Sequence, residues 1–342
     1  ISNKKFLSMR PRLTTSLSHL RVGDSFFSLQ RSRARACYEL AQAHRQGARK
    51  LFSYHFVDIF QGKHQQCSSC PVEKLTLLKK FYETDLSALD KLQEIGITGT
   101  NGKTSVAHIL QQALKCSGQN WVVVGTLGLT FPGQMATYKL GLTTPDIIDY
   151  WWVKKITIEQ GYQGLISEVS SHSLEQRRNY GCNYQAVLIT SVSGDDHLDY
   201  HGSIYRYFLA KSKIFNNFAS QVTIMHHDNP LQAFIDYDRI NTRIVRVAHT
   251  KIFEKQDLKY AFHRQHLDLV EAYLRVFYLT PSKPIQKWLE HPGLLGRAQQ
   301  FSWCQQRQII VDYAHTPKAL EFVSEILKTL YPNAPLWIMF GC

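Results

Sequence analysis

The 342-residue chain lacks the features of membrane, disulfide-rich and repetitive proteins. No apolar run approaches the roughly 18 residues of a membrane-spanning helix, and the longest, 121–131, is interrupted by Gly125 and Gly128. Its seven cysteines are odd in number and scattered, which favours a reducing compartment. Cys67 and Cys70 with His64 could hold zinc, but a lone pair is a weak signal. We expect a soluble, cytoplasmic globular protein.

Acidic side chains are scarce near the start of the chain. Residues 1–50 contain eleven Lys and Arg but only Asp24 and Glu39, and the whole chain has a formal charge of +13. This basic segment could bind a polyanion or a diphosphate substrate, or it could form a solvated surface. The length allows two or three domains, and 44% hydrophobic residues suffice for a buried core.

Strand and helix signals alternate from about residue 94, which favours a parallel sheet covered by helices on both faces. The expected strands are 94–98, 121–125, 164–169, 186–190, 308–311 and 336–340, and the expected helices follow Lys103 and cover 145–160 and 318–330. We expect residues 1–93 to form a separate, small α/β unit with a helix near 35–46. We therefore predict an α/β protein with a P-loop-type central sheet.

Residues 96–105, Gly-Ile-Thr-Gly-Thr-Asn-Gly-Lys-Thr-Ser, form a glycine-rich loop between an expected strand and an expected helix. Such a loop exposes backbone N–H groups to phosphate, while Lys103 would bind phosphate oxygens and Thr104 would bind Mg²⁺. Ile97 stands where the common phosphate-loop pattern has glycine. The alternative is a glycine-rich turn with an incidental lysine. We predict a nucleotide-binding site.

Two polar clusters follow expected strands. Glu168-Val-Ser-Ser-His172 overlaps the end of one strand, and Asp195-Asp-His-Leu-Asp-Tyr-His201 follows the next. The carboxyl ends of parallel strands share one edge of a sheet, where ligands bind. Carboxylate oxygens suit Mg²⁺. Either cluster alone could instead be a helix N-cap.

Six motifs in order resemble the Mur ligase family, and within it the MurE type, over about residues 95–342. The motifs are Gly99–Thr104, Thr143–Pro145, Glu168–His172, Asp196–Gly202, Gly296–Arg297 and Asp312–Pro317. The resemblance implies an ATP- and Mg²⁺-dependent ligase that makes an acyl phosphate and then an amide. Its substrates would be UDP-MurNAc-L-Ala-D-Glu and a diamino acid in peptidoglycan synthesis. The diamino acid would be meso-diaminopimelate, the more prevalent choice, or lysine. We expect a monomer, with no nucleic-acid partner.

The resemblance also implies roles for individual residues. ATP would be bound by Gly99, Thr100, Asn101, Gly102, Lys103, Thr104, Ser105, Arg297 and Asp312. The UDP-MurNAc-peptide would be bound by Thr143, Thr144, Ser170, Gln176 and Arg178. One Mg²⁺ would be bound by Thr104 and Glu168, and a second by His197 and a carbamylated Lys211. The catalytic residues would be Lys103, His197 and Lys211.

The resemblance further implies three units: a divergent UDP-substrate domain (1–93), an ATP-binding domain (94–296) and an incomplete, Rossmann-like amino-acid domain (297–342). The chain departs from the family at His226, where an asparagine is expected, and at Ala261-Phe262-His263, where a Phe-Asn motif is expected. Two alternatives stay open. One is a ligase of the folylpolyglutamate or cyanophycin type. The other is a truncated or decayed homologue that binds nucleotide without turnover.

Overall fold

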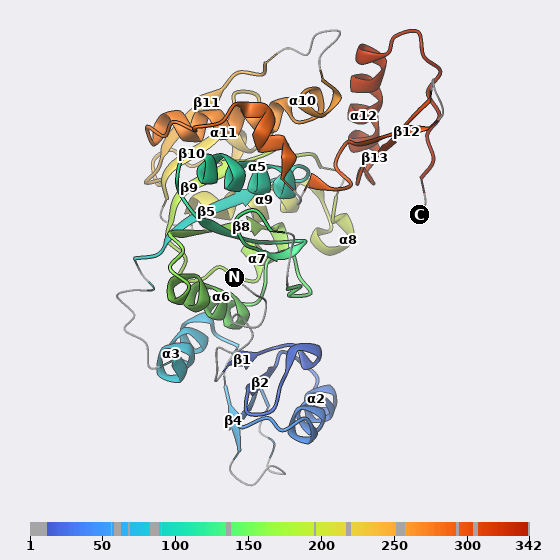
Figure 1. Cartoon of the computed structure of the whole chain (residues 1–342). Coiled ribbons are helices and arrows are strands. Elements are labelled where there is room, and N and C mark those ends of the chain that lie inside the picture. The colour runs from blue at the N-terminus through green and yellow to red at the C-terminus, as the bar shows by residue number, and fades with distance from the viewer. Residues whose placement is uncertain are drawn as a thin grey trace.

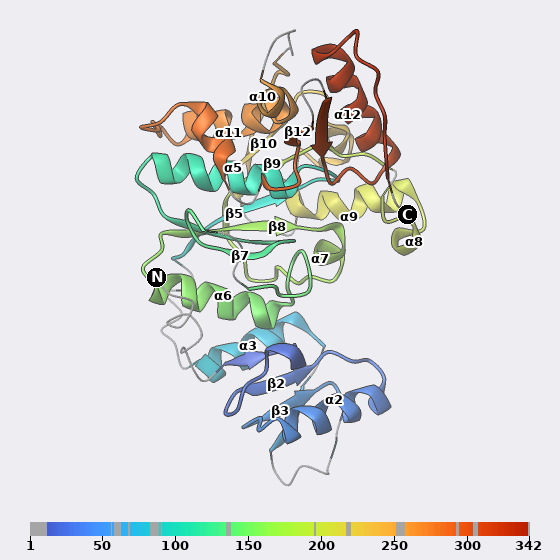
Figure 2. The ribbon, with the colours of Figure 1, turned by 45° about the vertical axis from the view of Figure 1, so that its right-hand side comes forward.

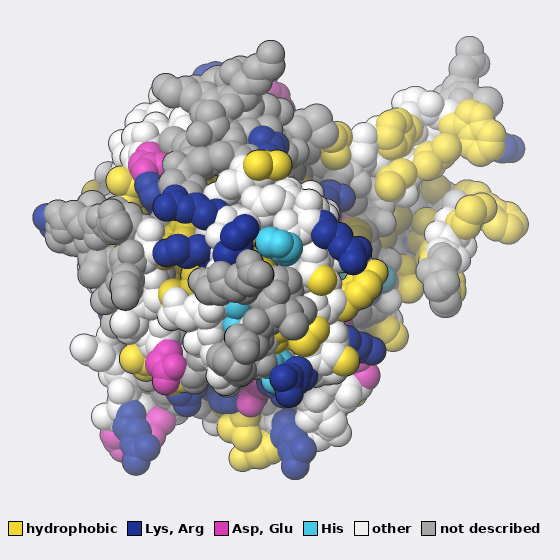
Figure 3. All heavy atoms as spheres, turned by 90° about the horizontal axis from the view of Figure 1, so that it is seen from below, with side chains coloured by type: hydrophobic (Ala, Val, Ile, Leu, Met, Phe, Trp, Pro, Cys, Tyr) yellow, Lys and Arg dark blue, Asp and Glu magenta, His cyan; other side chains and the backbone are white. Residues whose placement is uncertain are grey.

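The first unit of the fold is a small parallel sheet near the N-terminus (Figure 1). The computed structural model describes residues 12–55, 57, 63–67, 69–82, 89, 91–134, 138–194, 196–216, 220–250, 257–291, 294–303 and 307–340. The sheet contains β1 (Leu13–Thr14), β2 (Ser25–Ser28), β3 (Leu51–Ser53) and β4 (His64–Gln66), in that order. Its helices are η1 (Leu17–His19), α2 (Arg33–Arg45) and α3 (Pro71–Tyr82). Seen from below, basic side chains outnumber acidic ones on this part of the surface (Figure 3).

A seven-stranded sheet forms the centre of the molecule, in the order β11-β10-β9-β5-β8-β6-β7. Its strands are β5 (Gln93–Thr98), β6 (Trp121–Gly125), β7 (Gly128–Thr130), β8 (Gly164–Val169), β9 (Tyr184–Ile189), β10 (Ser220–His226) and β11 (Arg243–Val247). All neighbours are parallel except β6 and β7. Strand β5 lies between β8 and β9, so the loop after β5 is near the middle of the carboxyl edge.

Helices cover both faces of this sheet (Figure 2). One face packs on α5 (Lys103–Cys116), α11 (Arg264–Val276) and η4 (Ile285–Glu290), through Ile95 and Ile97 among others. The other packs on α6 (Ile147–Glu159) and α9 (Ile204–Asn216). Between and beside them lie α7 (Ser171–Glu175), α8 (Leu198–His201), η3 (Pro230–Phe234) and α10 (Leu258–Phe262). Burial on both faces explains why the strands are almost continuously apolar.

Helix α6 joins the N-terminal unit to the central sheet. Its residues Ile148 and Trp151 share an apolar cluster with Leu13 and Phe27. Two buried ion pairs accompany this cluster: Arg12–Asp149 at 3.3 Å and Lys74–Asp146 at 3.2 Å. The contact is therefore both apolar and electrostatic.

The last described part is an antiparallel pair, β12 (Gln299–Trp303) and β13 (Arg307–Val311), followed by α12 (Pro317–Leu330). Ile326 and Leu327 of α12 pack on Leu258 and Phe262 of α10. The predicted strand at 336–340 is wrong, because these residues join no ladder in the described structure. A strand needs a neighbour for its N–H and C=O groups.

The α/β class and the predicted parallel sheet flanked by helices are confirmed. No helix in the described ranges has the length and apolar character needed to cross a membrane.

Candidate nucleotide and metal site

The loop between β5 and α5 depends on two glycines. Gly99 and Gly102 have φ angles of 149° and 88°, which side chains rarely adopt. A Cβ at Gly99 would lie 1.9 Å from Thr190 Oγ1, and one at Gly102 would lie 2.4 Å from His266 Nε2. Both positions therefore require glycine for space as well as for backbone conformation.

Two lysine ammonium groups lie on this loop. Lys103 Nζ donates to the carbonyl oxygens of Gly99 (2.9 Å) and Thr100 (2.8 Å), and Lys211 Nζ donates to Gly99 O at 2.8 Å. Burial lowers the pKa of both lysines, and the proximity of Lys103 lowers that of Lys211 further. The loop and α9 together thus place two lysine amines where an anion would bind.

Thr104 and Glu168 form an oxygen-rich pair beside the loop. Thr104 Oγ1 donates to Glu168 Oε2 at 3.0 Å, and Thr126 donates to the same carboxylate through N (3.1 Å) and Oγ1 (3.1 Å). Burial raises the pKa of Glu168, and the charge of Lys103 opposes that shift. Hydroxyl and carboxylate oxygens are the ligands that Mg²⁺ prefers, so the residues present fit that ion.

A second polar network holds the residues expected to bind a peptide substrate. Thr144 Oγ1 donates to Glu168 O (2.8 Å) and accepts from Ser170 N (3.0 Å). Arg178 donates to Thr144 O at 3.0 Å and to Gln176 Oε1 at 2.6 Å. The predicted residue Thr143 lies 3.1 Å from Thr126, oxygen to oxygen. The structure therefore brings this whole predicted set to the same edge as Glu168.

His197 lies in a separate group of rings. Its Nε2 is 3.4 Å from Asp196 Oδ2, and its ring centroid is 4.7 Å from that of His172. Burial and the neighbouring histidines lower the pKa of His172 to about 4. No contact within the described ranges joins His197 to Thr104, Glu168 or Lys211. Asp195 lies outside the described residues.

Arg297 and Asp312 lie next to each other in the C-terminal part. The Arg297 guanidinium stands 4.2 Å above the Tyr313 ring. Burial lowers the pKa of Arg297, while Asp312 and Glu168 oppose that shift electrostatically. Asp312 accepts backbone hydrogen bonds from Ala298 (2.9 Å) and Ala314 (2.8 Å). Asp312 thus fixes the turn, and the Arg297 charge interacts with the phosphate-loop region.

A family model described as the Mur ligase middle domain matches residues 97–290. The chain belongs to the Mur ligase family. The UDP-N-acetylmuramoyl-L-alanyl-D-glutamate--2,6-diaminopimelate ligase of Pseudomonas putida is 30% identical over 288 residues, which cover 74% of this chain and 57% of that protein. The chain therefore spans a little over half the length of this curated relative.

Solved Mur ligase structures share the fold. A UDP-N-acetylmuramoyl-L-alanyl-D-glutamate--2,6-diaminopimelate ligase matches with a TM-score of 0.66 at 22% identity, over 94% of this chain and 71% of that one. MurF from Thermotoga maritima, in complex with ADP, matches with a TM-score of 0.61 at 16% identity, over 96% and 76%.

Sequence reasoning missed several residues of this Mur ligase site. Thr126 directly follows an expected strand at the ligand-binding edge, and that position could have identified it. His266 contacts the loop from a distant helix, which no local pattern shows. It also lines a cavity of about 230 Å³ next to the loop. The lining residues are Thr190, Ser191, Val192, His226, Asp228, Asn229, Pro230, His249, Gln265, His266 and Leu269.

Proposed function

We propose that the whole protein is an ATP-dependent amide ligase of the MurE type. It would join a diamino acid, meso-diaminopimelate, to UDP-MurNAc-L-Ala-D-Glu during peptidoglycan synthesis in the cytoplasm. The observation that carries the proposal is the buried Thr104–Glu168 pair beside the loop that holds Lys103. The name of the Pseudomonas putida relative supports the choice of substrates.

The reaction would proceed in two displacements. A carboxylate oxygen of the dipeptide attacks the γ-phosphorus of ATP, and ADP leaves. The amine of the incoming amino acid then attacks the acyl carbon, phosphate leaves and the amine loses a proton. The loop N–H groups and Lys103 would hold the phosphates in line and stabilise their charge. Arg297 and Asp312 would contact ATP from the C-terminal part.

We assign one Mg²⁺ to Thr104 and Glu168 and a second to His197 and a carbamylated Lys211, where the two ions would neutralise phosphate charge. Only a neutral amine can attack carbon dioxide to form a carbamate. The burial that lowers the pKa of Lys211 favours that neutral form. A carbamate would also replace a buried positive charge with oxygen ligands.

We assign the dipeptide end of the substrate to Thr143, Thr144, Ser170, Gln176 and Arg178. The planar fork of Arg178 is held on two sides, by Gln176 and by the carbonyl of Thr144. A guanidinium fixed in this way suits a carboxylate or phosphate. The three units 1–93, 94–296 and 297–342 would serve UDP-substrate, ATP and amino acid respectively.

Isotope exchange tests the first displacement without the amino acid. When ATP carries ¹⁸O in its β,γ-bridge, the label should move into the non-bridging β-phosphate oxygens only when Mg²⁺ and UDP-MurNAc-L-Ala-D-Glu are both present.

A binding measurement tests the role of Lys103. Lys103→Ala should weaken the free energy of ATP binding by roughly 1.5–3 kcal/mol, the scale of a lost charge-assisted bond. Lys115→Ala, on the last turn of the same helix, is the matched control.

The same assay separates the alternatives. Scrambling driven by a folyl or cyanophycin-type acid, and not by the UDP-dipeptide, would overturn the proposed substrate. Tight ATP binding without scrambling would indicate a nucleotide-binding protein that has no turnover.

A further inference from the structure

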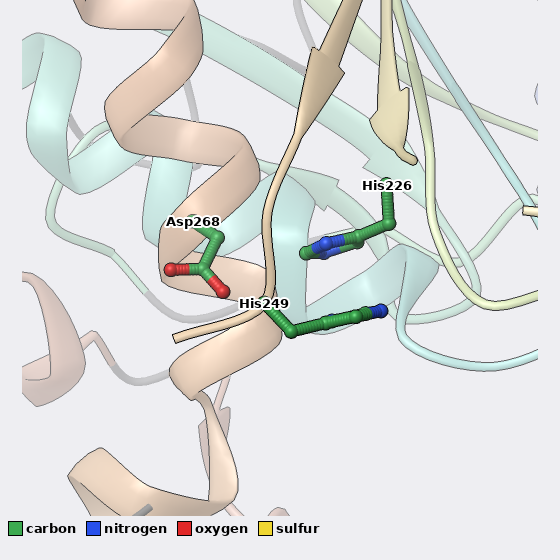
Figure 4. A group of neighbouring side chains, drawn as sticks. All are labelled: His226, His249 and Asp268. Atoms are coloured by element: carbon green, nitrogen blue, oxygen red, sulfur yellow. The ribbon is translucent and has the colours of Figure 1, made fainter. Parts of the chain in front are cut away.

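Three side chains from distant parts of the sequence meet beside the cavity next to the phosphate loop. His226 ends β10, His249 follows β11, and Asp268 lies on α11 (Figure 4). One potential ligand atom from each lies within 4.8 Å of the others. None of the three belongs to the nucleotide, peptide or Mg²⁺ sets assigned above, although His226 replaces an asparagine that the family resemblance places at the adenine.

The first imidazole has a buried nitrogen that faces no partner. His226 is 5% exposed, and its Nε2 lies 3.1 Å from the carbonyl oxygen of Gln265. A carbonyl only accepts, so Nε2 carries the proton and Nδ1 holds a lone pair. No atom of the described chain donates to that Nδ1. A buried lone pair without a donor is costly unless something binds it.

The second imidazole is oriented by a carboxylate. His249 Nε2 lies 2.8 Å from Asp228 Oδ1, so Nε2 donates and Nδ1 is left as the acceptor. A carboxylate that holds the far N–H of a histidine fixes the tautomer and raises the basicity of the metal-binding nitrogen. Both histidines therefore offer Nδ1.

Hydrogen bonds from Arg264 and Thr250 hold the carboxylate of Asp268 in place, mainly through Oδ1. Arg264 Nη2 donates to Oδ1 at 2.7 Å, and Thr250 Oγ1 donates to the same oxygen at 2.7 Å. Oδ2 accepts from Thr250 N at 3.2 Å. The second oxygen thus keeps lone-pair capacity on a carboxylate that cannot swing away.

We propose that His226, His249 and Asp268 bind a divalent transition-metal ion, with Zn²⁺ the first candidate. Two imidazoles and one carboxylate form a ligand set typical of zinc with one open position. The two rings are stacked at 4.0 Å with an interplanar angle of 10°. The exposed His249 ring would turn out of this stack about its hydrogen bond to Asp228, which keeps Nε2 as the donor, so that the Nδ1 lone pair points to the ion.

The site goes beyond the proposed function and differs from the Mg²⁺ site in chemistry. Mg²⁺ prefers oxygen ligands, whereas imidazole nitrogen favours Zn²⁺, Ni²⁺ and Cu²⁺. The ion would link β10, the segment after β11 and α11 at the cavity wall.

Competition with a chromophoric chelator measures the stoichiometry and affinity of Zn²⁺ binding to the full chain. Cys67→Ser and Cys70→Ser would remove the thiol pair that could hold zinc with His64, and excess Mg²⁺ would fill oxygen sites. We expect one equivalent of Zn²⁺. Asp228→Ala should weaken it by roughly 10–100-fold, as loss of an orienting carboxylate does, and His249→Ala should abolish stoichiometric binding.

The control is His227→Ala, because His227, Asp228 and His249 form a second, exposed group of possible ligands. It should bind Zn²⁺ as the parent does. Cu²⁺ electron paramagnetic resonance should show two coupled nitrogens in the parent and one in His226→Gln, provided that circular dichroism shows this variant folded. Undiminished binding in His249→Ala, or loss in His227→Ala, would overturn the proposal.

Discussion

At the scale of single residues, Lys211 and Lys213 differ sharply although they lie two positions apart on α9. Lys211 is buried on the phosphate loop, whereas Lys213 pairs with Glu175 at 2.6 Å near the surface. With ¹³C-bicarbonate, we expect a carbamate resonance in the parent and in Lys213→Ala but not in Lys211→Ala. Lys211→Ala should also lose isotope exchange, with partial rescue by short carboxylates. A carbamate signal that survives Lys211→Ala would contradict the assignment.

Gly102 allows a second residue-scale prediction. Gly102→Ala introduces both a strained φ of 88° and a clash with His266 Nε2. Gly118→Ala is the matched control, since its φ is 79° but its Cβ would meet open space. We expect Gly118→Ala to cost about 1 kcal/mol of unfolding free energy and Gly102→Ala to cost more. Adding His266→Ala should recover the difference in urea unfolding. Equal costs for both glycines would refute the contact.

At the scale of elements, α5 meets the end of η4 through two buried histidines. The His108 and His291 rings lie 4.9 Å apart. Burial lowers the pKa of His108 to about 4 and that of His291 to about 3, from the usual 6.5. The unfolded chain therefore binds more protons below pH 6.5, so stability is full above that pH and declines as the pH falls towards 4.

The expected measurement is the slope of unfolding free energy against pH. Each such histidine contributes up to about 1.4 kcal/mol per pH unit. His291→Gln should therefore flatten the slope between pH 6 and pH 5, while the exposed His315→Gln should not. An unchanged slope in His291→Gln would mean that His291 is not held neutral.

The bounds of secondary-structure elements were predicted most accurately for apolar strands that are followed by a glycine-containing loop. Strands β5, β6 and β8 lie within a residue of their expected bounds. Strands β10 and β11 were missed, and 336–340 was wrongly predicted. An apolar run becomes a strand only beside a partner, and pairing between distant segments leaves no local pattern.

The candidate site likewise contains residues that local sequence signals predicted and residues that they did not. Glu168 and Thr104 follow local strand-to-loop signals, and the structure brings them together. The His226–His249 stack and the contact of His266 with the loop depend on how α11 packs, which periodicity cannot give. The boundaries after residues 93 and 296, and the roles of the site residues, stay predictions.

At the scale of the whole molecule, the buried Arg12–Asp149 pair joins the N-terminal unit to α6. The Arg12 guanidinium lies 3.7 Å from the Trp152 ring and 3.3 Å from Asp149. Asp149→Ala would leave that buried charge without its carboxylate, at a cost of about 3–5 kcal/mol. Glu290→Ala, which removes the exposed pair with Lys287, should cost no more than about 1 kcal/mol.

Because Asp149 lies on α6, between the small sheet and the central one, the loss should not be spread evenly. We expect Asp149→Ala to release the N-terminal unit at lower urea, so that tryptophan fluorescence, dominated at this contact by Trp151 and Trp152, changes before the helical circular dichroism signal. Under the proposed function, the same variant should also lose affinity for the UDP-substrate, since the N-terminal unit would no longer be held against α6, while ATP binding at the loop persists. A single transition at the parental urea concentration would show that the apolar cluster alone holds the two sheets together.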